Sequence, residues 1–225
     1  MNDQETQKAR DTDTQAPPET RERILLAALH LFSANGYNTV SMREVAAAAE
    51  ISKPMLYYYF ESKQGLLEAL LDSALRSMQR AIDRIITSDS RVDEKLRMIT
   101  RMRFQLARDN PDMVKLFLDA LEDPGLKHEV RRFLARGHKM LGPIADLVRT
   151  AQQQNVLRDD LDPWLVPLAI MGITGMYVHL SLSFWTDAPE LSDELADQVW
   201  KLVMEGAQPR PSTPKLAQAA PDVPG

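Results

Sequence analysis

The chain of 225 residues contains no cysteine, and this absence excludes several classes of protein. A chain without cysteine can form no disulfide-stabilised scaffold, no thiolate zinc site and no thiol nucleophile. The start of the sequence also lacks the charged segment and apolar run of a secretory signal peptide, so we expect a cytoplasmic protein. Hydrophobic residues make up 44% of the chain, which is enough for a sizeable core.

The motifs of the common enzyme classes are missing as well. The sequence holds no glycine-rich phosphate loop and no Gly-x-Ser-x-Gly nucleophile elbow. His128 and Glu129 begin like a zinc-protease helix, but the second histidine does not follow. None of the four histidines has an acidic residue three positions before it, as a di-iron bundle needs. We therefore expect a protein that is not an enzyme and that needs no metal ion or cofactor.

Strand-like alternation is missing, whereas apolar residues recur at helical spacing in one segment after another. We expect helices in residues 20–35, 64–86, 92–109, 112–121, 126–151, 163–186 and 192–205. Gly142 and Pro143 are expected to kink the helix 126–151. Together with two shorter helices described below, these segments predict an all-α fold of about nine helices.

Charged side chains are missing from residues 163–186. This segment is long enough to cross a membrane, but Pro167 and Gly172 lie within it and no cluster of Lys or Arg flanks it. A helix that is apolar on every side also suits a soluble protein, where one face meets the core and the other meets a partner subunit. We therefore expect this helix and the next one to form a homodimer interface. The predicted interface residues are Trp164, Leu168, Gly172, Leu195, Val199, Leu202 and Val203.

Residues 41–63 predict two short helices joined by a tight turn. Ser41 and Glu44 have the Ser-x-x-Glu spacing of a capping box, which would begin the first helix. Ser52 can cap the second helix, and Pro54 falls in its first turn, where a missing N–H group costs nothing. This arrangement is typical of a helix-turn-helix.

The second of these helices is short and rich in aromatic residues. Leu56 and Phe60 stand four residues apart on one face and can be buried together. The remaining side chains must point elsewhere, because three consecutive tyrosines cannot all lie in the core. These side chains are Lys53, Met55, Tyr57, Tyr58 and Tyr59.

Residues 20–63 resemble the DNA-binding part of the TetR/AcrR family of bacterial transcriptional regulators. The resemblance rests on Leu31-Phe-Ser-Ala-Asn-Gly-Tyr37, on Val45-Ala46 and on Ser52-Lys-Pro-Met-Leu-Tyr-Tyr-Tyr-Phe60 followed by Ser62 and Lys63. The chain departs from the family pattern at Glu50, because the turn between the two helices usually carries glycine there. We therefore expect a non-glycine residue at a positive φ.

The resemblance implies a transcriptional regulator, most often a repressor, that binds a palindromic operator as a homodimer and is released by a small molecule. An activator of the same family, or a helical ligand-binding or adaptor protein, is the alternative. Residues 20–64 hold five basic and four acidic side chains, so phosphate contacts must be local. The residues expected to contact double-stranded operator DNA are Ser41, Arg43, Ser52, Lys53, Pro54, Met55, Tyr57, Tyr58, Tyr59 and Lys63.

The chain divides by composition into four parts. We expect a disordered arm (1–19), a helix-turn-helix domain (20–65), a helical effector-binding and dimerisation domain (66–206) and a disordered, proline-rich tail (207–225).

Methionine and aromatic residues gather in the second domain. They can line a pocket for an apolar or weakly polar effector, or they can be ordinary core residues. Arg103 and His179 are polar exceptions on apolar segments and can be ligand contacts or satisfied core residues. The candidate effector-binding residues are Arg103, Phe104, Met113, Phe117, Met140, Met171, Tyr177 and His179.

Overall fold

The computed structural model describes residues 18–183, 187 and 190–208, and every regular element in these ranges is a helix. The elements are α2 (Pro18–Asn35), α3 (Met42–Ala48), α4 (Lys53–Tyr59), α5 (Lys63–Ile86), α6 (Val92–Asp109), α7 (Pro111–Glu122), η1 (Pro124–Leu126), α8 (Lys127–Lys139), α9 (Leu141–Gln153), α10 (Leu165–Ser183) and α11 (Asp193–Ala207). The all-α prediction is therefore confirmed. The predicted arm and tail lie outside the described residues, apart from residues 18–19 and 207–208.

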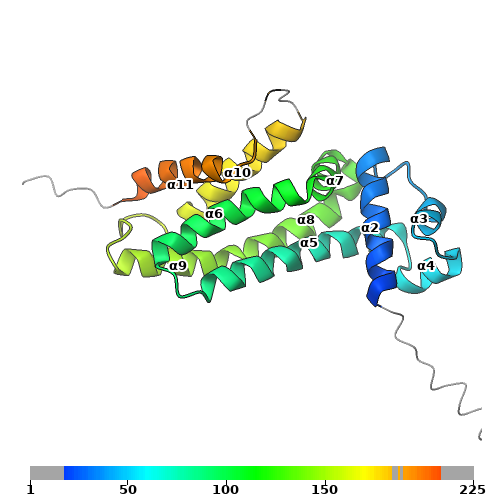
Figure 1. Cartoon of the computed structure of the whole chain (residues 1–225), viewed down its shortest axis with the longest axis horizontal. Helices are drawn as coiled ribbons and strands as arrows, with labels where there is room; N and C mark the ends of the chain where they lie inside the picture. The colour runs from blue at the N-terminus through cyan, green and yellow to red at the C-terminus, as the bar shows by residue number, and fades with distance from the viewer. Residues whose placement is uncertain (1–17, 184–186, 188–189, 209–225) are drawn as a thin grey trace, which may run out of the picture.

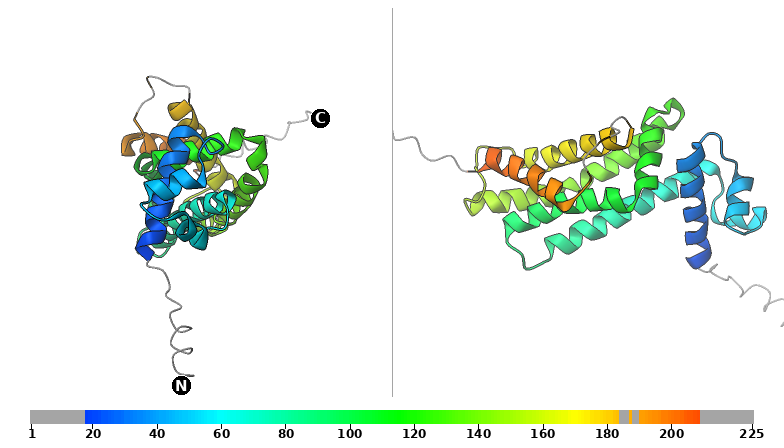
Figure 2. Two further views of the ribbon diagram at one scale, coloured as in Figure 1. Left: turned by 90° about the vertical axis from the view of Figure 1, so that its right-hand side faces the viewer. Right: turned by 45° about the horizontal axis from the view of Figure 1, so that its top comes forward.

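The molecule is elongated, and α2, α3 and α4 form one end of it, which we call the head (Figure 1). The helix α2 stands across the long axis, with α3 and α4 beyond it. The helices α5 to α11 form the rest of the molecule, which we call the body. The long helix α5 runs from the head along the body. Figure 2 shows α10 and α11 on one side of the body, where both pack against α6.

Local signals begin the helices α3 and α4 as predicted, and a glycine ends α2. The Ser41 hydroxyl oxygen accepts from the N–H of Glu44 at 3.3 Å, and the Glu44 carboxylate accepts from the N–H of Ser41 at 2.7 Å. This is the expected capping box. The Ser52 hydroxyl caps α4 by accepting from the N–H of Met55 at 3.3 Å. Gly36 follows α2 with a φ of 81°, which glycine adopts without strain.

The turn between α3 and α4 places a glutamate in the left-handed region. Glu50 has a φ of 53°, which confirms the expectation of a positive φ at a non-glycine residue. Its N–H donates to the carbonyl of Ala47 at 3.1 Å, and the N–H of Ile51 donates to the carbonyl of Ala46 at 3.0 Å. These two bonds form a Schellman motif, which normally recruits glycine. The hydrogen bonding of the motif therefore holds a backbone conformation that an L side chain disfavours.

The head shares its apolar core with the body. Ile24 and Phe32 of α2 and Leu56 of α4 are fully buried in one cluster with Leu66 of α5 and Leu116 of α7. The first turns of α5 thus complete the head core, and α7 also packs against α2. A displacement of either body helix must therefore disturb the packing of the head.

Polar contacts reinforce the junction of head and body. The Lys115 ammonium donates to the carbonyl of Ser33 near the end of α2 at 2.5 Å. The side-chain amide of Asn38, in the loop after α2, donates to the Asp123 carboxylate before η1 at 2.7 Å. Both contacts tie the C-terminal end of α2 to the segment around α7.

The predicted helix 126–151 is two helices. The helix α8 ends at Lys139, Met140 links the two segments, and α9 begins at Leu141. The prediction of one kinked helix was wrong because Pro143 falls in the first turn of a new helix. A proline there lacks an N–H that would have no partner anyway, whereas in a helix interior it would cost about 3 kcal/mol or more.

Candidate nucleic-acid interface

Buried faces fix α3 and α4 in the head. Val45, Ala46 and Ala49 anchor α3, and Leu56 and Phe60 anchor α4, as the sequence predicted. The opposite faces of both helices are therefore exposed at the outer end of the molecule (Figure 1).

Most residues predicted to contact DNA lie on this exposed surface. Tyr58 is 65% exposed, and the Lys53 ammonium lies 5.7 Å from the centroid of the Tyr57 ring, within cation–π range. Such a surface offers cations to guanine edges or phosphates and apolar groups to thymine methyls. The exposed members are Ser41, Arg43, Ser52, Lys53, Pro54, Met55, Tyr57 and Tyr58.

The hydroxyl of Ser41 is already engaged. Besides accepting from the N–H of Glu44, it donates to the Glu44 carboxylate at 2.7 Å. The side-chain and backbone hydrogen bonds from Ser41 lower the pKa of Glu44, so this carboxylate stays charged on the outer surface. Ser41 can donate to a phosphate through its hydroxyl only by giving up the bond to Glu44.

The position of Tyr59 argues against its predicted contact with DNA. Tyr59 is partly buried against the head core, and its ring lies edge-on to that of Tyr58 at 5.5 Å. Its hydroxyl is buried and has no hydrogen-bond partner within the described part of the chain. A phenol in this place cannot reach a phosphate, so we remove Tyr59 from the candidate interface.

Lys63, at the start of α5, is held against the head. Its ammonium donates to the carbonyl of Asn38 at 3.2 Å and lies 4.4 Å from the centroid of the Tyr37 ring. Partial burial lowers the pKa of Lys63, and the nearby Glu44 opposes this shift. An ammonium has three donors, so the bond to Asn38 leaves donors for a phosphate. The role of Lys63 at DNA stays a prediction.

The predicted effector-binding residues fall into three separate clusters of the core. Met113 and Phe117 pack on the head core, where Phe117 lies 4.7 Å from Phe133 between ring centroids. Met140 and Met171 belong to the large body core. The sequence could not show this division, because helical spacing does not reveal which helix each apolar face meets.

The remaining four candidates lie on α6 and α10. The rings of Phe104 and Tyr177 meet edge to face at 6.0 Å between centroids, and Phe104 is fully buried. Arg103 donates from Nε to the Thr174 hydroxyl at 2.6 Å. His179 lies farther along α10, with its Nδ1 atom buried. The contact of α6 with α10 is thus the place where the structure brings predicted polar and aromatic candidates together.

The predicted dimer residues divide between the interior and the surface. Leu168 and Gly172 of α10 are exposed, and Leu202 of α11 is 63% exposed. Trp164 is partly buried because its ring stacks on His138 at 5.3 Å. Leu195 and Val203 are also partly buried against the protein's own core.

Val199 is a correction to the predicted interface. It is only 7% exposed and belongs to a small core cluster with Phe104 and Ala196. Its side chain is taken up by its own subunit, so it has little surface to offer a partner.

The segment Leu165–Leu182 of α10 is unusually apolar for an exposed helix. Its mean hydropathy is 1.7, and by length and composition it could cross a membrane. Only 28% of this segment is buried in the single chain. The predicted interface helix is therefore largely uncovered in the monomer.

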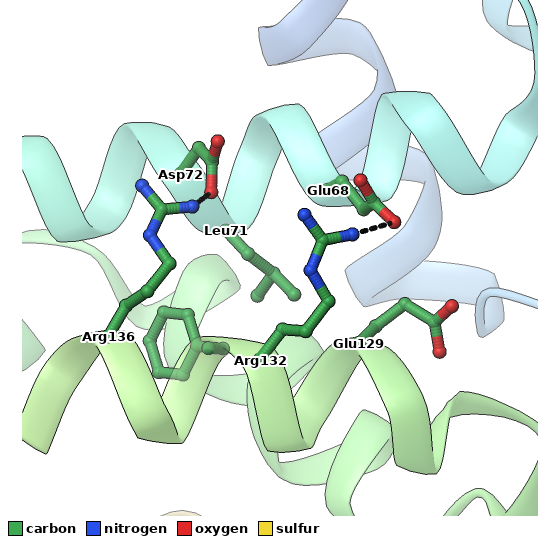
Figure 3. A pocket seen from close by; sticks show the side chains of 7 residues that line it. Glu68, Leu71, Asp72, Glu129, Arg132 and Arg136 are labelled. Carbon is green, nitrogen blue, oxygen red and sulfur yellow. Dashed lines mark hydrogen bonds and ion pairs between the residues drawn. The ribbon is translucent and has the colours of Figure 1, made fainter.

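A ladder of polar contacts between α5 and α8 was not predicted. Glu68 of α5 pairs with Arg132 of α8 at 2.9 Å, and Asp72 pairs with Arg136 one turn further along (Figure 3). These residues line a shallow groove together with Glu129, which accepts a hydrogen bond from Gln64. The sequence does contain a signal, because two acidic residues stand four apart on one helix and two arginines stand four apart on another. Only the fold shows that these two helices lie side by side, so the sequence alone could not pair them.

Comparison with known proteins agrees with the geometry of the head. Residues 24–70 match the family model described as bacterial regulatory proteins, tetR family. The HTH-type transcriptional regulator UidR of Escherichia coli is 27% identical over 165 residues, which cover 72% of this chain and 80% of that protein. The HTH-type transcriptional repressor NicS of Pseudomonas putida is 24% identical, over 80% of this chain and 86% of the relative.

Among solved structures, the fatty acid degradation regulator FadR of Bacillus halodurans has the same fold. Its TM-score is 0.69 at 21% identity, and the match covers 85% of this chain and 97% of FadR. The family match falls on the residues that build the exposed surface of α3 and α4. We conclude that residues 24–70 form a DNA-binding domain of the TetR type of bacterial regulatory proteins, and that the chain is a DNA-binding transcriptional regulator.

Proposed function

We propose that the protein is a cytoplasmic repressor that binds a palindromic operator as a homodimer and leaves it when a small effector enters the body. The observation that carries this proposal is the exposed surface of cations and tyrosines on α3 and α4, held in place by the buried faces of the same helices. The likeness to NicS, whose name describes a repressor, supports repression over activation.

The proposed contacts follow the exposure of each side chain. Arg43, Lys53 and Tyr57 are exposed and reach toward bases, together with Pro54 and Met55 on the same short helix. Ser41 and Lys63 flank this surface and are proposed to meet phosphates. Contacts to bases select the sequence, whereas contacts to phosphates position the protein on the duplex.

The experiment that tests DNA binding is an electrophoretic mobility shift with the intergenic DNA upstream of the chain's own coding sequence. We expect a specific complex that competitor DNA of unrelated sequence does not abolish. Arg43→Ala should reduce the free energy of binding to this DNA by about 1–3 kcal/mol and should relax the preference at one base pair, as expected for a lost contact to a base edge. Arg80→Ala, which removes an exposed arginine on α5 outside the head, is the matched control and should leave binding unchanged.

The homodimer is proposed from the uncovered surface of α10 and α11. Leu165, Leu168 and Met176 of α10 and Leu202 of α11 are exposed large apolar side chains. Covering them with the same helices of a second chain would form a four-helix bundle with twofold symmetry. Both helices belong to the body and not to the head, so the two heads of such a dimer would stay free to meet DNA (Figure 1). Sedimentation at micromolar concentration should show a dimer, and a monomer would contradict the proposal.

A dimer senses an effector through the spacing of its two heads. Two recognition helices read two half-sites only when they lie about 34–36 Å apart, which is one turn of the duplex. The ladder between α5 and α8 and the shared core around Leu66 and Leu116 connect body movements to the head. An effector that lowers DNA affinity 100-fold must supply about 2.7 kcal/mol of differential binding.

The switch is tested by adding candidate molecules to the protein alone and to its DNA complex. Molecules that raise the melting temperature of the protein should lower the fraction of shifted DNA. Tight binders from several chemical classes that leave DNA affinity unchanged would contradict the inducer mechanism. If expression of a reporter gene behind the bound DNA falls when the protein is deleted, the protein is an activator and not a repressor.

A further inference from the structure

Arg103 is a partly buried cation without a counterion among the described residues. Its Nε group donates to Thr174, and a methyl group placed on Gly175 would lie 3.9 Å from its Nη2 atom. The guanidinium therefore lies directly against the backbone of α10. Burial, the sole cause, lowers the pKa of Arg103 to about 10.

Three other arginines of α6 each have an acidic or carbonyl hydrogen-bond acceptor. Arg97 and Arg101 both donate to the carboxylate of Asp197 at distances from 2.5 to 2.9 Å, and Arg108 donates to the carbonyl of Leu191 at 2.7 Å. Within residues 18–183, 187 and 190–208, no acidic group lies within ion-pair distance of Arg103. Withdrawing a charge from water without a partner costs free energy even when burial is partial, so an apolar residue would be less costly at this position.

The contact with Thr174 limits what else can bind there. The Thr174 hydroxyl accepts from Arg103 and donates to the carbonyl of Ile170 at 2.7 Å, so it has no hydrogen left for a ligand. The two Nη groups of Arg103 remain available, and their parallel N–H bonds match the two oxygens of one carboxylate. One guanidinium neutralises one negative charge, which favours a carboxylate over a dianionic phosphate.

A small apolar cluster lies on the same two helices as this contact. Phe104, which follows Arg103 on α6, meets Tyr177 of α10 edge to face, and Ile173 and Leu195 pack on the same cluster with part of their surface still exposed. Burial raises the pKa of the Tyr177 phenol, which keeps it uncharged. A ligand placed here would therefore meet one cation and several apolar side chains.

We infer that Arg103 anchors the effector, and that the effector is an apolar molecule with a single carboxylate. The carboxylate accepts from the Nη groups of Arg103, and the apolar part lies against the partly exposed side chains of Tyr177, Ile173 and Leu195. This inference rests on the proposed effector site of the body and names its ligand class. It also changes the expectation of a hydrophobic or weakly polar effector into one of an anionic amphiphile.

The test compares straight-chain carboxylic acids of six to sixteen carbons, and ring-bearing acids such as naphthoic acid, with the alcohols of the same skeleton. Affinities are measured on the full-length protein by calorimetry below the micelle concentration. For at least one pair the acid should bind about tenfold more tightly than the alcohol. In Arg103→Met this ratio should fall to about one, with the affinity of the alcohol unchanged.

Two further variants keep the test decisive. Arg108→Met, which removes an arginine from the exposed end of the same helix, should retain the preference for the acid. Arg103→Lys keeps the charge but loses the planar pair of donors, so its ratio of acid to alcohol affinity should be intermediate. This variant replaces Arg103→Met in the test if Arg103→Met fails to fold. The inference is overturned if no acid binds more tightly than its alcohol, or if Arg103→Met keeps the preference.

The outcome can be separated from that of the proposed function. A protein that fails to shift its upstream DNA without any ligand refutes the repressor, whatever the acids do. An acid that binds through Arg103 but leaves the DNA complex intact supports the anion site and refutes only the inducer mechanism.

Discussion

The carboxylate of Asp197 joins α11 to α6, and its removal should measurably destabilise the body. It accepts hydrogen bonds from the Nε atoms of Arg97 and Arg101 at 2.9 and 2.7 Å, and from one Nη atom of each at 2.5 and 2.6 Å. The two arginines are one turn apart on α6, so both reach the same carboxylate. Asp197→Asn keeps the shape of the side chain but removes its charge and one acceptor oxygen.

The expected loss follows from the exposure of the three side chains. Hydrogen bonds to charged groups contribute about 1.5–3 kcal/mol when buried, and exposed ion pairs contribute about 0.2–1 kcal/mol. Asp197 is 30% exposed and both arginines about as much, so solvent screens part of the interaction. We expect Asp197→Asn to lower the free energy of unfolding by about 1–2 kcal/mol. The melting temperature should then fall by about 2–8 °C for a chain of this size.

The same effect should depend on pH in a defined direction. Hydrogen bonds from Arg101 and then Arg97 hold the pKa of Asp197 below its ordinary value of 3.8. A lowered folded-state pKa contributes stability that is present above the unfolded pKa and is lost as pH falls toward the folded pKa. The difference between wild type and Asp197→Asn should therefore be constant from pH 7 to 5 and should shrink below about pH 4.

Urea unfolding at pH 7, 5 and 3.5 measures both quantities. Glu205→Gln is the matched control, because it removes a carboxylate of α11 whose partner, Lys201, lies on the same helix at 3.7 Å. This exposed pair should contribute less than about 0.5 kcal/mol. The reasoning is refuted if Asp197→Asn is no more destabilising than Glu205→Gln at pH 7, or if its effect persists unchanged at pH 3.5.

Three further predictions concern the dimer, the turn and the DNA surface. Leu202→Glu should shift the dimer toward monomer in sedimentation, because it would bury a charge in the proposed interface. Leu134→Glu, the same change at another exposed leucine on α8, should not. Glu50→Gly should raise the free energy of unfolding by up to about 1 kcal/mol, since relief of the positive φ outweighs the added chain entropy, whereas Glu50→Ala should give no such gain. Lys63→Ala should reduce the slope of log affinity against log salt by about one unit on operator and unrelated DNA alike, and an unchanged slope would contradict a phosphate contact.

The local signals of the head were readable because they act over a few residues. The capping box of Ser41 and Glu44, the cap at Ser52 and the positive φ at Glu50 each depend on backbone atoms no more than four positions away. The buried faces of α3 and α4 followed from spacing in the same way. These features therefore appear in the structure as the sequence predicts them.

The surroundings of a side chain depended on contacts between distant segments. Tyr59 and Val199 looked like surface residues of their helices, but neighbouring elements cover both of them. The candidate effector residues are of similar types but do not lie together in the structure. Phe117 packs on the head core, whereas Phe104 packs on α11.

The sequence by itself determined most of the helices, the caps of α3 and α4 and the helix-turn-helix, since these depend on short-range spacing. Only the tertiary structure decided which charges are paired. It placed Asp197 between two arginines about a hundred residues earlier in the chain, and it left Arg103, on the same helix as those arginines, without an acidic partner among the described residues. An ion pair requires two atoms within about 4 Å, and this distance is set by how helices pack rather than by how residues follow one another.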